Sequence, residues 1–225
     1  MMVRTLLLFC LMITVTTVAQ SQPDLPFCGL RAKSKKFIEM LFGDTYRFFR
    51  VVDNDTIVDI GASSGAQAGA LSAILDIRHV TFVLVDIDTG CLNLQRVQHM
   101  KAFYERLKGS SIENQFRVVN NTPDSLWLPP STYKKVWLIN TLHEIPNKLA
   151  MVKAIAGILR SRGEVIVLER IAISPGQKHG GCHLPLLNED ELVGMFQTSG
   201  FTIIDRLDRK VNKQHHVTAF RFQYN

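Results

Sequence analysis

A glycine-rich turn is the feature of this sequence best suited to bind a ligand. Residues 56–60 (TIVDI) have the pattern of a buried strand, and the turn 61–65 (GASSG) follows directly, before a helical pattern. Glycine lets the backbone turn tightly and approach a ligand, and the N–H groups of a helix start point at it. Asp86 ends the next apolar run, where a carboxylate can accept hydrogen bonds from ribose hydroxyls. Together they predict a site for an adenosine cofactor; a ligand-free turn and a solvated acid are the alternatives.

Residues with acid–base chemistry follow the two later apolar runs. Residues 136–140 (VWLIN) precede His143 and Glu144, and the run 164–169 (EVIVLE) ends in Glu169. An imidazole titrates near neutral pH and can take a proton from a reacting group. We therefore expect His143 and Glu169 to be catalytic residues on the side of a second substrate. Packing of His143 at a strand-to-helix turn is the alternative.

A loop at residues 172–187 contains three more side chains with the chemistry of metal ligands. They are His179, Cys182 and His183, in the order H-x-x-C-H. This order is not a recognised zinc spacing, and histidines in loops are usually solvated. The sequence therefore predicts no metal site. Acid–base or substrate contacts and ordinary loop packing both remain open for this loop.

These residues need a scaffold, and the alternation of strand-like and helix-like segments predicts one. Five apolar runs are separated by helical patterns, which is typical of a mostly parallel sheet covered on both faces. A short turn joins two closing strands, so these must be antiparallel. The predicted strands are 56–60, 80–85, 116–119, 136–140, 164–169, 201–207 and 216–222. The predicted helices are 30–42, 68–77, 89–107, 148–159 and 188–199.

The ordered set of motifs resembles the class I S-adenosylmethionine-dependent methyltransferases over residues 30–225. The acid and glycine turn of that family is similar to 59–65 (DIGASSG), with Ser63 in place of the middle glycine. The turn before its fifth strand is similar to 159–163 (LRSRG), where Ser161 and Arg162 replace the usual proline and glycine. The resemblance implies cofactor contacts by Asp59, Gly61, Ser63, Gly65, Asp86, Asp124 and Asn140.

The resemblance also implies the fold. We expect a single Rossmann-like domain with a seven-stranded, mostly parallel sheet, an antiparallel last strand and helices on both faces. A nicotinamide dehydrogenase is a weaker alternative, because the glycine spacing differs from G-x-G-x-x-G. The pair Tyr104 and Lys108 has the Y-x-x-x-K spacing of short-chain dehydrogenases, but it comes too early in the chain. We interpret both as residues on a helix surface.

Composition narrows the class of protein further. The chain has 225 residues, of which 46% are hydrophobic and 20% charged, so disorder and coiled-coil architectures are excluded. Its net charge of +6 comes from 26 basic and 20 acidic residues, without a run of five Lys or Arg. Nucleic acid is therefore not an expected partner. A small molecule is the expected methyl acceptor.

The first residues have the pattern of an export signal. Arg4 precedes an apolar stretch, and small residues lead to Ala19, so residues 1–19 are predicted to be a signal peptide and 20–28 a linker. The domain is then 29–225. We expect a secreted or periplasmic protein without a stable membrane span after removal of the signal; an uncleaved membrane anchor is the alternative.

The number of cysteines limits the disulfides that this chain can form. Removal of the signal leaves Cys28, Cys91 and Cys182, so at most one internal disulfide can form and one thiol remains.

The expected function is an S-adenosylmethionine-dependent methyltransferase. The alternative is a non-catalytic S-adenosylmethionine-binding protein on the same scaffold, because a charged cofactor does not readily reach an exported enzyme.

Overall fold

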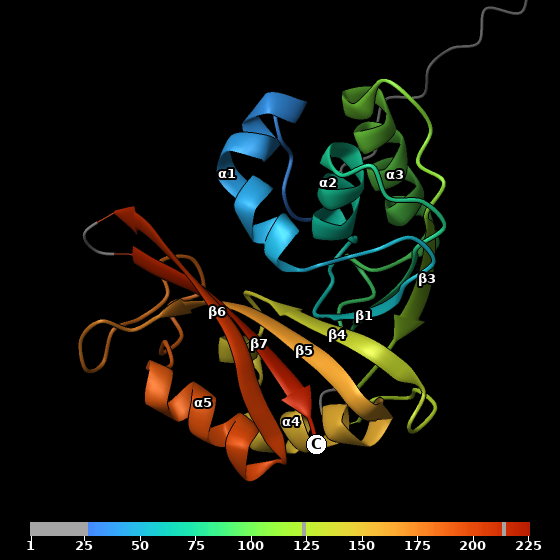
Figure 1. Ribbon diagram of the computed structural model, residues 1–225. Helices are drawn as coiled ribbons and strands as arrows, with labels where there is room; N and C mark the ends of the chain where they lie inside the picture. The colour runs from blue at the N-terminus through green and yellow to red at the C-terminus, as the bar shows by residue number, and fades with distance from the viewer. Residues whose placement is uncertain (1–26, 123–124, 213–214) are drawn as a thin grey trace, which may run out of the picture.

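Helices and strands alternate along most of the chain (Figure 1). The computed structural model describes residues 27–122, 125–212 and 215–225. The elements in these ranges are α1 (Lys35–Phe48), β1 (Thr56–Ile60), α2 (Ala66–Ile74), β2 (Thr81–Asp86), α3 (Leu94–Lys108), β3 (Gln115–Asn120), β4 (Tyr133–Ile139), the 3-10 helix η1 (Leu142–Glu144), α4 (Lys148–Ile158), β5 (Leu159–Ile171), α5 (Glu189–Thr198), β6 (Phe201–Asn212) and β7 (His215–Tyr224).

The seven strands form one sheet in the order β3-β2-β1-β4-β5-β7-β6. The first five strands are parallel, and β7 is antiparallel to both of its neighbours, β5 and β6. This confirms the predicted fold. The chain builds the sheet outward from β1 to β3 and then returns to add β4 on the other side of β1. Such a reversal opens a crevice at the carboxyl ends of the strands, where open α/β sheets bind ligands.

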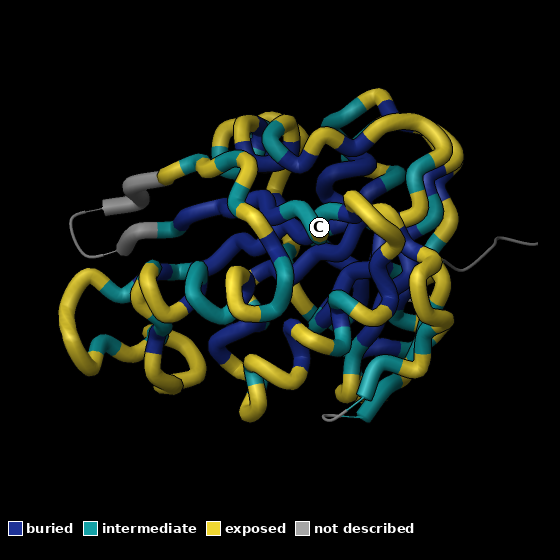
Figure 2. Tube along the Cα trace, turned by 60° about the horizontal axis from the view of Figure 1, so that its bottom comes forward, coloured by how far each residue is buried: buried dark blue, intermediate teal, exposed yellow. Residues whose placement is uncertain are grey.

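Each face of the sheet has its own hydrophobic core. Helices α1, α2 and α3 cover one face, and α4 and α5 cover the other (Figure 1). Successive strand residues alternate between the two cores, so Ile57 packs under the first group of helices and Val58 under the second. Figure 2 shows the buried residues running through the middle of the molecule, with exposed segments around them.

Side-chain caps set the helix starts more sharply than the apolar pattern does. Helix α1 was predicted at 30–42 but begins after Ser34, whose hydroxyl accepts from the Phe37 N–H, and it continues to Phe48. Helix α3 begins after Asn93, five residues later than predicted, because the Asn93 side chain caps it. Helix α5 begins after Asn188, whose side chain accepts from the Glu191 N–H.

Strands β5 and β6 are longer than predicted. The sequence indicates 164–169 for β5, whereas the strand runs from Leu159 to Ile171. Strand β6 continues to Asn212 rather than ending at residue 207. Both extensions are paired with a neighbouring strand. Backbone hydrogen bonds to a neighbouring strand determine where β5 and β6 end. Such bonds do not require an alternating apolar pattern, so the sequence does not show these ends.

The packed domain includes residues that the sequence assigns to a linker. Phe27 is buried, and its ring packs against Phe103 with centroids 5.2 Å apart. Cys28 forms a disulfide with Cys91, and Cys182 is free. This agrees with the prediction of at most one internal disulfide and one remaining thiol. Two residues of the predicted linker thus pack with the domain. The predicted signal peptide, 1–19, lies outside the described residues, and no helix among those described is long and apolar enough to span a bilayer.

Candidate functional site

A cavity of about 640 Å³ lies at the carboxyl ends of β1, β2 and β4. It is formed by the turn after β1, the end of β2, the loop after β3, the segment from the end of β4 to η1, and residues near Cys28. The residues lining it are Gly29, Leu30, Ile60, Gly61, Ala62, Ser63, Ala66, Gln67, Val85, Asp86, Ile87, Asp88, Cys91, Asn121, Thr122, Ile139, Asn140, Thr141, Glu144, Ile145, Pro146 and Met151. The sequence predicted a ligand site at these carboxyl ends of the strands.

The turn after β1 requires glycine at its two ends. Gly61 has φ +73°, and a Cβ there would lie 2.2 Å from the Thr141 side chain. Gly65 has φ +77°, and a Cβ there would lie 2.6 Å from Leu84. Gly61 lines the cavity, whereas Gly65 starts α2 behind it. Ser63, which replaces the family's middle glycine, adopts φ +52° and also lines the cavity.

The carboxylate of Asp86 joins the two strand-end loops at the cavity wall. Its Oδ2 accepts a hydrogen bond from the Ser63 N–H at 2.7 Å, and its Oδ1 accepts from the Asp88 N–H at 2.9 Å. A carboxylate has about four acceptor positions, so two remain for a ligand. Asp88 also lines the cavity, but its Oδ1 accepts from the N–H groups of Gly90 and Cys91. Each carboxylate thus keeps two acceptor positions, and Asp86, which ends β2, is the one that also holds the glycine turn.

Asp59 lies inside the fold rather than on the described cavity wall. It is 2% exposed and sits on β1, two residues before Gly61. Burial, and to a smaller extent the nearby negative charge of Asp86, raise the pKa of Asp59 to about 7. The resemblance implied a cofactor contact here. The structure places this carboxyl in the interior, on β1, and it is not among the residues that line the cavity.

Two further predicted contacts belong to the loops after β3 and β4. Asn140 follows β4, has φ +52° and lines the cavity. Asparagine tolerates this left-handed conformation better than most residues do. Asp124 lies outside the described residues. Its neighbour Thr122 lines the cavity, and the hydroxyls of Thr122 and Ser125 are 2.8 Å apart.

His143 and Glu169 form a buried pair behind the cavity. The His143 Nδ1 lies 2.9 Å from Glu169 Oε2, and both side chains are 1% exposed. Glu169 Oε1 accepts from the Leu142 N–H at 2.6 Å. The His143 Nε2 has no hydrogen-bond partner and lies 3.6 Å from Glu144 Oε1. Glu144, unlike the pair, lines the cavity and connects it with His143.

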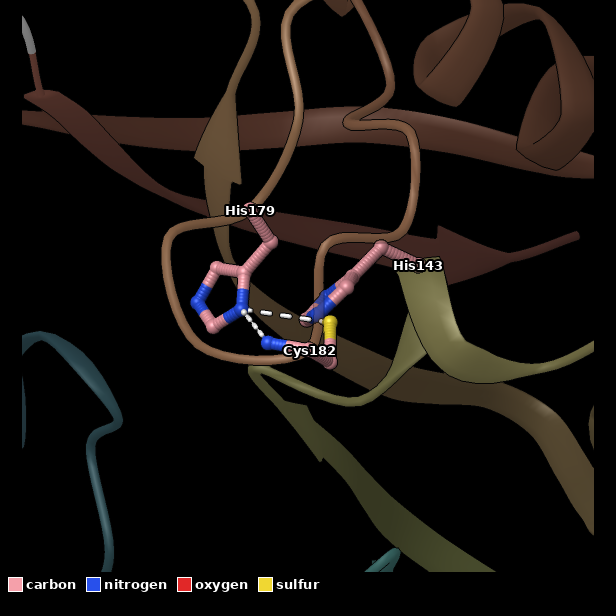
Figure 3. Close-up of side chains that lie close together, drawn as sticks. All are labelled: His143, His179 and Cys182. Carbon is pink, nitrogen blue, oxygen red and sulfur yellow. Dashed lines mark hydrogen bonds between the residues drawn. The ribbon is translucent and has the colours of Figure 1, made fainter.

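The loop after β5 brings two of its three candidate residues to His143. The rings of His143 and His179 are 4.6 Å apart, and Cys182 Sγ lies 3.2 Å from His179 Nδ1 (Figure 3). Burial lowers the pKa of His179, the nearby His143 and Arg170 act in the same direction, and the carboxylates of Glu144 and Glu169 act against it. This favours the neutral imidazole. His183 is exposed and lies outside this group.

Several residues around the cavity were missed from the sequence. Gln67 lines it and accepts a hydrogen bond from the Tyr46 hydroxyl at 2.6 Å. Leu30 lines it because the disulfide holds the first described segment there, and its carbonyl accepts from the Tyr104 hydroxyl at 2.7 Å. Tyr104 is fully buried, so its interpretation as a surface residue is wrong. The only signal in the sequence for the position of the segment around Leu30 was the cysteine count, which allows one disulfide.

No protein-family model and no curated protein matches this sequence. Among solved structures, the cyclase SpnF has a TM-score of 0.62 at 15% identity, covering 86% of this chain and 83% of that chain. A SAM-dependent methyltransferase from Methanosarcina mazei has 0.61 at 13% identity, covering 80% and 96%.

A third similar structure is a SAM-dependent methyltransferase from Aquifex aeolicus, with a TM-score of 0.59 at 12% identity over 85% of this chain and 99% of that chain. The similarity extends over most of every chain compared, and at these identities it concerns the fold. Since one of the three is a cyclase, the fold by itself does not specify a reaction. The chain has the Rossmann-like fold of the S-adenosylmethionine-dependent methyltransferases.

Proposed function

We propose that this protein is an S-adenosylmethionine-dependent methyltransferase acting on a small-molecule acceptor. The observation that carries the proposal is the cavity at the reversal of strand order, whose wall contains the glycine turn and, hydrogen-bonded to it, the Asp86 carboxylate. The fold shared with methyltransferases supports it.

The described residues fit this cofactor. A cavity of about 640 Å³ is in the usual range for a ligand of this size. Asp86 has two acceptor positions left for the ribose hydroxyls, because only two backbone N–H groups occupy it. The absence of a side chain at Gly61 keeps the turn close to Thr141 and leaves room above it. Asn140 lines the cavity at the end of β4, where it would flank the sulfonium.

Bound here, the cofactor would supply a methyl group on a positively charged sulfur. Transfer would form a bond from the acceptor's lone pair to the methyl carbon and break the carbon–sulfur bond, so that the cofactor would leave as a neutral thioether. An acceptor that carries a proton must lose it. The Nε2 of His143 is a suitable base, because Glu169 holds the opposite ring nitrogen and Glu144 links His143 to the cavity.

The non-catalytic binding protein remains the second candidate, and one observation favours it. The His143–Glu169 pair lies behind the described cavity wall, so a proton from the acceptor would need the Glu144 carboxylate or a rotation of this segment. Binding alone would require neither. The two candidates share the cofactor site and differ in turnover.

Calorimetry with S-adenosylmethionine and its demethylated product tests the site. Asp86→Asn keeps an acceptor oxygen for the turn but removes the charge, so we expect affinity to fall about 10- to 150-fold. Asp88→Asn removes the same charge two residues away and should change affinity less than about threefold. Equal affinities of Asp86→Asn and the wild type, or a loss confined to Asp88→Asn, would contradict the assignment of the ribose contact.

Turnover against a panel of small acceptors distinguishes the two candidates. For a methyltransferase, His143→Gln should reduce turnover about 10²- to 10⁴-fold while cofactor affinity stays the same. Absence of product from a wild type that binds the cofactor would favour the binding protein. Absence of cofactor binding would contradict both.

We also propose export, as the first residues suggest. Support comes from the Cys28–Cys91 disulfide, because disulfides persist mainly in oxidising compartments. Mass spectrometry of protein from the native host should find a mature start close to Gln20. An intact Met1 on membrane-bound material would indicate the anchor instead.

A further inference from the structure

Three potential metal ligands from two separate parts of the chain converge beside the cavity. His143 comes from η1, and His179 and Cys182 come from the loop after β5. One ligand atom from each lies within 4.8 Å of those of the other two. Figure 3 shows the three side chains turned toward one another. The sequence predicted no metal here because H-x-x-C-H is not a recognised zinc spacing, and His143 lies 36 residues before His179 in the chain.

His143 is prepared to act as a ligand. Its Nε2 is buried without a hydrogen-bond partner, which is costly for a polar atom unless something else satisfies it. Its Nδ1 lies 2.9 Å from the Glu169 carboxylate. Histidines that bind metals usually donate the other ring N–H to such a carboxylate, which fixes the ring and makes the free nitrogen a better donor. The Glu169–His143 pair has this arrangement.

The loop presents its two ligands on one tight turn. The His179 N–H donates to the Leu184 carbonyl at 2.8 Å, and the His183 N–H donates to the His179 carbonyl at 3.0 Å. An isolated bridge between Lys178 and Pro185 closes the base of this turn. His179 and Cys182 are therefore held together on this turn.

We propose that His143, His179 and Cys182 bind a zinc ion. Two imidazoles and one thiolate are a donor set that Zn²⁺ prefers, and three protein ligands leave its fourth position for water or a substrate. The thiol proton of Cys182 leaves to solvent when the sulfur binds the ion. Glu144 and Glu169 place two negative charges nearby, which offset the positive charge of Arg170 beside His179.

The ligand atoms need only a small movement to surround an ion. Bonds of about 2.0–2.3 Å place tetrahedral ligands about 3.3–3.6 Å apart, so the longest separation must shorten by about 1 Å. The loop carrying Cys182 is exposed and can make this movement. An ion on Nε2 would prevent His143 from acting as a base. The ion, through its open position, would then favour the deprotonated acceptor.

Metal binding to the untagged, oxidised full-length chain tests the proposal without reference to methyl transfer. We expect equilibrium dialysis against Zn²⁺, followed by elemental analysis, to give one ion per chain. Co²⁺ in its place should give the intense near-ultraviolet absorption of a thiolate bound to cobalt. Cys182→Ala should abolish this absorption, and His179→Ala should weaken Zn²⁺ binding at least about tenfold. Both changes lie in a surface loop, so the fold should persist.

His183→Ala is the matched control, because it removes an imidazole from the same loop but outside the ligand group. It should bind Zn²⁺ like the wild type. Glu169→Gln should weaken binding about 10- to 100-fold through loss of the carboxylate behind His143. Failure of the wild type to bind Zn²⁺, or equal binding by Cys182→Ala, His179→Ala and the wild type, would overturn the proposal. Loss of turnover with metal binding intact would affect only the proposed function.

Discussion

Replacing Asp59 with asparagine should remove a specific loss of stability that the protein suffers as the pH rises. The carboxyl is buried on β1, and its pKa is raised to about 7 from the ordinary value of 3.8. In the unfolded chain it ionises near pH 4. Between these values the folded state holds a proton that the unfolded state has lost, so the free energy of unfolding falls as the pH rises.

The size of the effect follows from the width of this pH window. A difference of one bound proton is worth about 1.4 kcal/mol for each pH unit, and the window is about three units wide. The wild type should therefore lose about 4 kcal/mol between pH 4 and pH 7 because of Asp59, a large part of an ordinary domain's stability. Below pH 4 and above pH 8 this group should contribute no further slope.

Urea unfolding at a series of pH values, followed by circular dichroism without the cofactor, measures this contribution. Other acidic groups titrate in both proteins, so the stability difference between Asp59→Asn and the wild type isolates Asp59. We expect that difference to shift by about 4 kcal/mol in favour of the variant between pH 4 and pH 7. Asp86→Asn should shorten the window, because the charge of Asp86 helps to raise the pKa of Asp59. A pH-independent difference would refute the reasoning.

Two predictions concern the frame of the cavity. Gly61→Ala should destabilise the protein by about 2–4 kcal/mol in thermal unfolding, since φ is +73° and the new Cβ would meet Thr141. Gly157→Ala, on α4 with open space around it, is the control and should not destabilise; a comparable loss there would contradict the explanation. Replacing Cys28 and Cys91 by serine opens a link across 63 residues and should cost about 4 kcal/mol in urea unfolding. It should also weaken cofactor binding, and unchanged affinity would show that the first segment does not shape the cavity.

The sequence by itself determined the fold and the place of the cavity. Continuous apolar runs such as residues 80–85 occur where both faces of a strand are buried, so they predict a covered parallel sheet. The short connection between the last two strands requires them to be antiparallel. The glycine turn follows one strand and Asp86 ends the next, and the carboxyl ends of parallel strands meet at one edge of the sheet. These features are local, because each depends on a few consecutive residues.

Element ends, burial and long-range pairs were decided only by the tertiary structure. The length of β5 depends on hydrogen bonds to β4 and β7, and the burial of Tyr104 depends on the first segment lying across α3. The disulfide is equally non-local. The convergence of His143 with His179 and Cys182, from the loop after β5, is also non-local. Distances between side chains far apart in the chain arise from packing, and no spacing within the sequence encodes them.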